Sequence, residues 1–174
     1  MWQDYRSSLF PWLSITENIA FPLRIQGFSA KERKMAVNAL INDFDAELSL
    51  KDKIYTLSGG LQQLISVLRA LVIEPDLFLL DEPFSALDQY KRWRVGFELE
   101  KMWLKHKNSI FFVSHDVDEA VLLADEIILM NKLGNIEKIL KNTMPRNRTK
   151  EMMENKEFFN CRNEIVDFLF EQDR

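Results

Sequence analysis

A serine followed by two glycines is the first group of residues whose types and spacing could do chemistry. Ser58, Gly59 and Gly60 precede a run of apolar residues at helical spacing. The first turn of a helix presents unpaired backbone N–H groups and a partial positive charge, and both favour an anion such as a phosphate. A simple helix cap after a flexible turn is the alternative interpretation of the same residues.

Two adjacent carboxylates form the second group. Asp81 and Glu82 follow the short apolar run 77–80, which is typical of a buried strand. Ligands of open α/β sheets lie at the carboxyl ends of the strands. One carboxylate could hold Mg²⁺, and its neighbour could orient or deprotonate a water molecule. A solvated pair of acids at a strand end is the alternative.

The third candidate is His115, which follows the apolar run 110–113. If this strand and the strand 77–80 are parallel, His115 lies at the same sheet edge as Asp81. A histidine there can hydrogen-bond a phosphate. An ordinary capping or buried histidine is the alternative, and Gln3 carries almost no signal of its own.

Helices and strands that must position these groups can be read from caps and periodicity. Three continuous apolar runs separated by helical stretches predict an α/β fold with a parallel sheet covered on both faces. The runs are 77–80, 110–113 and 127–130. Capping patterns and apolar stripes predict helices after Ser14, after Ser29, over 58–73, over 89–107, after Asp116 and in the segment that follows Pro145.

Composition excludes several classes of protein. The 23 basic and 27 acidic residues give a net charge of −4, whereas a dedicated nucleic-acid binder is expected to be basic. A single cysteine, Cys161, and two histidines argue against a disulfide framework and a structural zinc site. No apolar run reaches the roughly 18 residues of a membrane span. We therefore expect a cytoplasmic protein that acts on a membrane only through a partner.

Taken in order, the motifs resemble those of the nucleotide-binding domain of ABC transporters. They are Leu-Ser-Gly-Gly, an apolar strand with Asp-Glu-Pro, Ser-Ala-Leu-Asp and Ser-His-Asp. Residues 81–88 and 114–125 look most like the nitrate, sulfonate and taurine importer branch, which Trp12 and residues 145–148 also fit. The resemblance implies a partial P-loop NTPase core, with a parallel sheet and a helical subdomain.

The resemblance implies a role in nucleotide chemistry for four residues. Asp81 matches the Walker B aspartate that acts on Mg²⁺, and Glu82 matches the general base for the attacking water. His115 matches the switch histidine on the γ-phosphate of ATP. Gln3 matches the Q-loop glutamine, which senses Mg²⁺ and the γ-phosphate.

Four further matches imply a two-subunit sandwich. Ser58, Gly59 and Gly60 match the signature that caps ATP held by the opposing subunit, and Asp88 matches the D-loop aspartate that closes across the dimer. The implied function is that of an ATP-binding and ATP-hydrolysing importer subunit that drives transport of a small anionic solute. The implied partners are an integral-membrane permease, a second copy or an intact ATPase subunit and, indirectly, an extracytoplasmic solute-binding protein, with no nucleic acid.

The same resemblance suggests how the chain is organised. We expect a Q-loop remnant at 1–7, a helical subdomain at 8–73, the remaining ATPase core at 74–145 and an amphipathic helical tail at 146–174. Such a subunit lies peripherally on the inner face of the cell membrane. The permease is expected to dock on the helical stretch 9–23, with Trp12 as a candidate contact.

Departures from the family pattern define the competing hypothesis. No G-x-x-x-x-G-K-[ST] motif occurs, so we expect the Walker A segment and the N-terminal β subdomain to be absent and the chain alone not to hydrolyse ATP. The alternative function is a truncated remnant or scaffold that only caps a partner's ATP. Leu61 and Leu64 replace residues that are usually polar, so they either extend a buried face or remove contacts near the nucleotide.

A DNA-repair or translation ATPase is a third hypothesis, but those proteins carry insertions or tandem domains not visible here.

Overall fold

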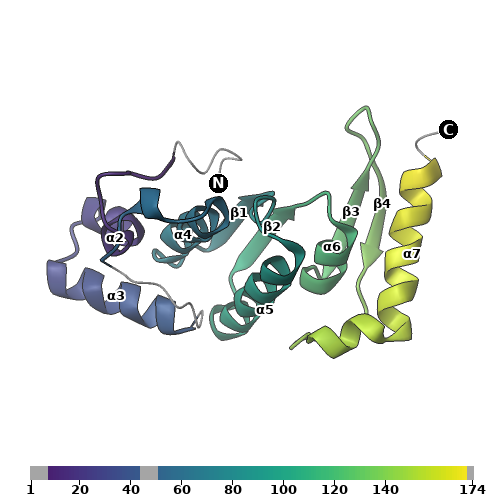
Figure 1. Cartoon of the computed structure of the whole chain (residues 1–174). Coiled ribbons are helices and arrows are strands. Elements are labelled where there is room, and N and C mark those ends of the chain that lie inside the picture. The colour runs from purple at the N-terminus through teal and green to yellow at the C-terminus, as the bar shows by residue number, and fades with distance from the viewer. Residues whose placement is uncertain (1–7, 44–50, 172–174) are drawn as a thin grey trace. The chain divides into compact units, whose positions relative to one another are not determined.

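The computed structural model describes residues 8–43 and 51–171, and Gln3 lies outside these ranges. The chain divides into two compact units, residues 1–113 and 114–174. The elements in chain order are listed with their bounds (Figure 1): α2 (Ile15–Ile25), α3 (Ala30–Asp43), η1 (Ile54–Thr56), α4 (Gly59–Leu71), β1 (Leu77–Asp81), α5 (Gln89–His106), β2 (Ser109–Val113), α6 (Val117–Leu123), β3 (Glu126–Met130), β4 (Ile136–Lys141), η2 (Lys150–Glu154) and α7 (Lys156–Glu171).

Helices α2 and α3 begin at the capping boxes that the sequence predicts. The Ser14 N–H donates to the Glu17 carboxylate at 2.7 Å, and the Glu17 N–H donates back to the Ser14 hydroxyl at 3.2 Å. Ser29 and Glu32 repeat this exchange at the start of α3. Two donors that a helix start would otherwise leave unpaired are satisfied in each case.

Helix α2 packs between α3 and α4 in the first unit. Buried Asn18 lies in α2 and fixes the segment before it, since its amide accepts from the Phe10 N–H at 2.8 Å and donates to the Phe10 carbonyl at 3.0 Å. Arg69 of α4 donates to the Ser8 carbonyl and stacks over the Phe10 ring at 4.7 Å. These contacts hold the segment from residue 8 onward against the helices.

Strands β1 and β2 pair in parallel, as predicted, with helix α5 as the crossover between them. The register runs from Leu77 opposite Ser109 to Asp81 opposite Val113. Phe78 and Leu80 are buried, but the opposite face of the pair is not covered by the described residues. The expectation of a sheet covered on both faces is therefore wrong for this pair. The exposed side chains, which we call the outer sheet face, are Leu77, Leu79, Phe111 and Val113.

Strand β3 corrects a second expectation. The run 127–130 is a strand, but it pairs antiparallel with β4 and not with the parallel pair. A tight turn joins the two strands, in which the Asn131 side chain accepts from the N–H groups of Leu133 and Asn135. Gly134 adopts a φ of 83° there, which glycine reaches without a Cβ clash. Strand β4 was not predicted, because its residues are neither continuously apolar nor strictly alternating between apolar and polar.

The last element of the second unit is the amphipathic helix expected after Pro145. Helix α7 packs on α6 and η2, with Phe158 and Ile165 buried. An ion pair of 2.8 Å joins Arg162 of α7 to Asp118 of α6. Leu169, which was expected on the packed stripe, is exposed. Among the described residues, no helix has the length and apolar character needed to span a bilayer.

Candidate functional site

Ser58 lies at the start of α4 as its N-cap. Its backbone is extended, its side chain is exposed, and its hydroxyl accepts from the Leu61 N–H at 3.4 Å. The N–H groups of the first helical turn, here those of Gly59 and Gly60, have no acceptor within the helix. This end of α4 therefore has both the cap and the polarity that an anion site requires.

Gly60 has a packing role in addition to its backbone N–H. A Cβ built on Gly60 would lie 2.6 Å from Leu87 Cδ2 and 3.3 Å from the Ala86 carbonyl oxygen. Only a residue without a side chain lets the first turn of α4 approach this segment so closely. The signature residues and the segment that follows the acid pair are thus in direct contact.

Two other positions on α4 bear on the departures from the family pattern. Leu64 is buried in the core of the first unit, and Leu61 is partly buried. Burial of Leu64 supports the interpretation that it extends an apolar face.

Asp81 is the last residue of β1, and its side chain is exposed. Glu82 follows with a φ of 43°, and its N–H donates to the Val113 carbonyl at 2.9 Å. Left-handed backbone in a residue other than glycine costs about 1–3 kcal/mol and persists only where surrounding contacts hold it. The acid pair is therefore placed by the sheet on one side and by a constrained turn on the other.

The turn at Glu82 is fastened by residues further along the chain. The Glu82 carbonyl accepts from the Ser85 hydroxyl at 3.1 Å and from the buried Gln63 amide of α4 at 3.1 Å. The sequence did not predict this contact of Gln63, because it depends on tertiary packing between α4 and the turn.

Asp88 is the N-cap of α5. Its carboxylate accepts from the Lys91 N–H at 3.0 Å and pairs with the Lys91 ammonium at 2.9 Å. These hydrogen bonds, first that of the side chain and then that of the backbone, lower the pKa of Asp88 below its ordinary value. Both side chains are exposed, so the carboxylate stays accessible to a partner.

His115 is exposed and belongs to the second unit. It lies in the turn that starts α6, where the Ser114 hydroxyl donates to Glu119 at 2.6 Å and accepts from the Asp116 N–H at 3.0 Å. Asp116 in turn caps the helix by accepting from the Glu119 N–H at 3.1 Å. The turn that carries His115 is thereby fixed, while its placement at the same sheet edge as Asp81 stays a prediction.

No cluster of three or more His, Cys, Asp or Glu side chains within the described ranges could hold a metal ion by itself. Mg²⁺ in nucleotide sites is commonly bound by one or two carboxylates together with phosphate oxygens and water. A single exposed carboxylate at a strand end, such as Asp81, fits that donor set.

The sequence of the chain is similar to those of known proteins. The family model described as "ABC transporter" matches residues 1–85. The bicarbonate transport ATP-binding protein CmpC of Synechocystis sp. is 40% identical over the whole of this chain and 26% of its own length. The aliphatic sulfonates import ATP-binding protein SsuB of Bacillus cereus is 36% identical over 86% of this chain and 58% of its own.

A solved structure has the same fold. The dimeric structure of MJ0796, a bacterial ABC transporter cassette, matches with a TM-score of 0.70 and 28% identity, over 80% of this chain and 60% of that one. A second structure of MJ0796, in a post-hydrolysis state bound to ADP and Pi, matches equally well. The chain thus spans less than two thirds of these relatives. The family match, the relatives and the shared fold together show that the chain belongs to the ATP-binding domains of ABC transporters.

Proposed function

We propose that the chain is the ATP-binding and ATP-hydrolysing subunit of an ABC importer. The observation that carries the proposal is the contact between Gly60 and Leu87, which joins the capped start of α4 to the segment that carries Asp81 and Glu82. The constrained acid pair offers carboxylates for Mg²⁺ and for the attacking water, and the capped helix start offers an anion site to ATP held by a second subunit.

Each candidate residue has a defined task in this proposal. ATP supplies the phosphoryl group and Mg²⁺ neutralises its charge, with Asp81, and Gln3 beyond the described residues, as the groups that would hold the ion. Glu82 accepts a proton from the attacking water. His115 hydrogen-bonds the γ-phosphate.

A second subunit is part of the proposal. Ser58, Gly59 and Gly60 face ATP bound to the partner, and Asp88 closes the contact between the two subunits. The exposure of Ser58 and Asp88 supports this assignment, since neither side chain is covered within its own chain. The dimeric MJ0796 cassette supports the same arrangement.

The transported solute is proposed to be small and anionic. Two relatives carry names that specify bicarbonate and aliphatic sulfonates, and both of these are small anions. An integral-membrane permease, together with an extracytoplasmic solute-binding protein, would confer the selectivity. The chain would lie on the inner face of the membrane against that permease.

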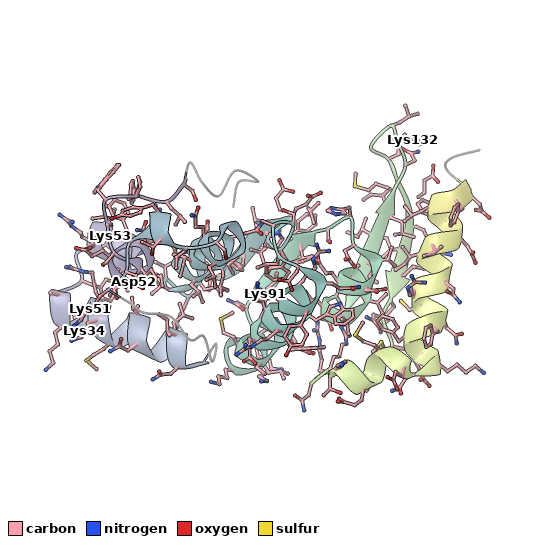
Figure 2. All side chains as sticks on the ribbon, in the orientation of Figure 1. Lys34, Lys51, Asp52, Lys53, Lys91 and Lys132 are labelled. Atoms are coloured by element: carbon pink, nitrogen blue, oxygen red, sulfur yellow. The ribbon has the colours of Figure 1, made fainter. Side chains whose placement is uncertain are left out.

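The permease is proposed to dock on a groove between α2 and α3, which we call the basic groove. It has a volume of about 370 Å³, and its apolar floor includes Leu13, Ala20 and Phe21. Four cationic side chains and one acid line its walls: Arg24, Arg33, Lys34, Lys51 and Glu17. Figure 2 shows Lys34 and Lys51 at this end of the first unit.

Charge supports one kind of occupant for the basic groove. The lining is strongly cationic although the chain as a whole has a net charge of −4. The single acid, Glu17, is engaged by the Ser14 N–H and hydroxyl at 2.7 Å. An amphipathic cytoplasmic helix of the permease with acidic side chains would match both the apolar floor and the cationic walls.

Transport of a radiolabelled solute and ATP turnover by the reconstituted importer test the proposal. Glu82→Gln should lower turnover at least about 10²-fold while ATP binding is retained, because only the proton acceptor is removed. Glu154→Gln, an exposed acid in η2, is the matched control and should behave as wild type. A Glu82→Gln importer with wild-type turnover would contradict the proposal. Turnover that needs an intact ATPase partner and is indifferent to Glu82 would favour the capping-only alternative.

A further inference from the structure

Gln63 is a buried polar residue that has no task in the nucleotide chemistry described above. Its side chain is 1% exposed, and it lies on α4 one turn beyond the signature residues. We propose that Gln63 is a positioning residue for Glu82: its amide fixes the turn that presents the Glu82 carboxylate and fastens that turn to α4. This inference rests on the proposed function of Glu82 as the base.

The Gln63 amide makes three hydrogen bonds to this turn. Its Nε2 donates to the Glu82 carbonyl at 3.1 Å and to the Ser85 hydroxyl at 3.3 Å, and its Oε1 accepts from the Ala86 N–H at 2.8 Å. A backbone N–H can only donate, so it determines which end of the amide faces Ala86. One side chain therefore holds the turn at three points.

The backbone of Glu82 needs such support. Its φ of 43° is unfavourable for a residue with a Cβ, and buried Pro83 follows it directly. The N–H side of Glu82 is tied to Val113 of the sheet, so the carbonyl side is the one that Gln63 and Ser85 hold. Without the Gln63 donor, the Glu82 carbonyl loses a hydrogen bond that ties the turn to α4.

A matched pair of glutamines gives the test. Gln63→Met keeps the approximate shape of the side chain and removes all three bonds. Gln62→Met is the control, because Gln62 also donates two hydrogen bonds from α4, at 3.2 Å to the Ile54 carbonyl and at 3.0 Å to that of Leu57, but none to the turn. Ser85→Ala, at an exposed position, is a milder variant that weakens the same turn should Gln63→Met fail to fold.

Steady-state kinetics of the reconstituted importer separate positioning from general destabilisation. Gln63→Met should lower kcat about 10- to 100-fold with KM for ATP within about twofold, since misplacing a reacting group affects the chemical step most. Ser85→Ala should shift kcat in the same direction by less. Gln62→Met should leave kcat within about twofold of wild type. Wild-type kcat in Gln63→Met and Ser85→Ala, or an equal loss in Gln62→Met, would overturn the inference.

Hydrogen exchange tests the role of Gln63 independently of the proposed function, because the measurement needs no ATP. In the full chain, Gln63→Met should accelerate exchange at the Ala86 amide, and Gln62→Met should not. An inactive wild-type importer would remove the proposed function and with it the assignment of Glu82 as the base. Unchanged exchange at the Ala86 amide in Gln63→Met would instead overturn the proposal that Gln63 positions the turn, whatever the activity of the importer.

Discussion

The backbone N–H of Glu82 donates a 2.9 Å hydrogen bond to the carbonyl oxygen of Val113. This bond belongs to the last register pair of the parallel ladder, that of Asp81 and Val113. The acid pair is consequently attached to the end of β2, and the chain reaches His115 two residues after that strand ends. The parallel register thus sets the carboxyl end of β1 beside the carboxyl end of β2.

Replacement of Gly60 by alanine should destabilise the first unit. The new Cβ would lie 2.6 Å from Leu87 Cδ2, and Leu87 is buried, so the side chain or the start of α4 has to move. Overpacking of this kind costs about 1–3 kcal/mol, against which a better helix propensity gives back at most about 1 kcal/mol. Urea unfolding measures the difference. In a Leu87→Ala background the cost of Gly60→Ala should largely disappear, and an equal cost in both backgrounds would refute the clash.

Trp12→Glu should release the permease without affecting nucleotide chemistry. The side chain is 69% exposed, so its replacement should change stability by less than about 0.5 kcal/mol. Co-purification with the permease is the readout, with ATP binding measured in parallel. Phe170→Glu is the control, because Phe170 is an aromatic side chain with the same 69% exposure on α7. If Trp12→Glu retains the permease as well as Phe170→Glu does, then Trp12 is not part of the docking surface.

Asn18→Leu should weaken the attachment of the segment around Phe10. The substitution keeps the volume but leaves the Phe10 N–H without its 2.8 Å acceptor, whereas the Phe10 carbonyl still accepts from the Leu13 N–H at 3.1 Å. A buried polar group left unpaired costs about 1–3 kcal/mol. Chemical denaturation should show this loss, whereas Asn163→Leu on the exposed surface of α7 should be nearly neutral. A neutral Asn18→Leu would mean that water replaces the amide.

Asp88 should give α5 a stability that depends on pH. Its pKa is lowered by the hydrogen bonds with Lys91, so its contribution is complete above the ordinary aspartate pKa of about 4 and is lost as pH falls through the lower value of the folded state. Asp88→Asn keeps a good N-cap without the charge. The stability difference between wild type and Asp88→Asn should therefore narrow below about pH 4. Thermal melts from pH 7 to pH 3 measure it, and a gap that stays constant would contradict the assignment.

Local signals predicted the helices of this chain well. Ser14 with Glu17 and Ser29 with Glu32 satisfy helix starts through residues three positions apart, so the sequence contains the whole interaction. The parallel pairing of β1 with β2 also followed from two apolar runs joined by a helix of crossover length. Strand β4 was missed because its partner β3 and the Asn131 turn, not its own apolar pattern, define it.

The positions of the candidate residues could be predicted, whereas the contacts that support them could not, and their roles stay predictions. Ser58 and Asp88 lie at helix caps, Asp81 lies at a strand end, and His115 lies in the turn between β2 and α6. The Gln63 amide and the close approach of Gly60 to Leu87 depend on how α4 packs against the turn after β1. Such contacts join positions 19 and 27 residues apart, which no local period encodes.

The outer sheet face has a consequence for the life of the chain in a cell. Leu77, Leu79, Phe111 and Val113 present a row of large apolar side chains to water, each more than 40% exposed. Surfaces of this kind are what chaperones retain and proteases sample. While no other polypeptide surface covers that row, the chain should bind holdases or aggregate, and a surface that covers it should raise the soluble yield.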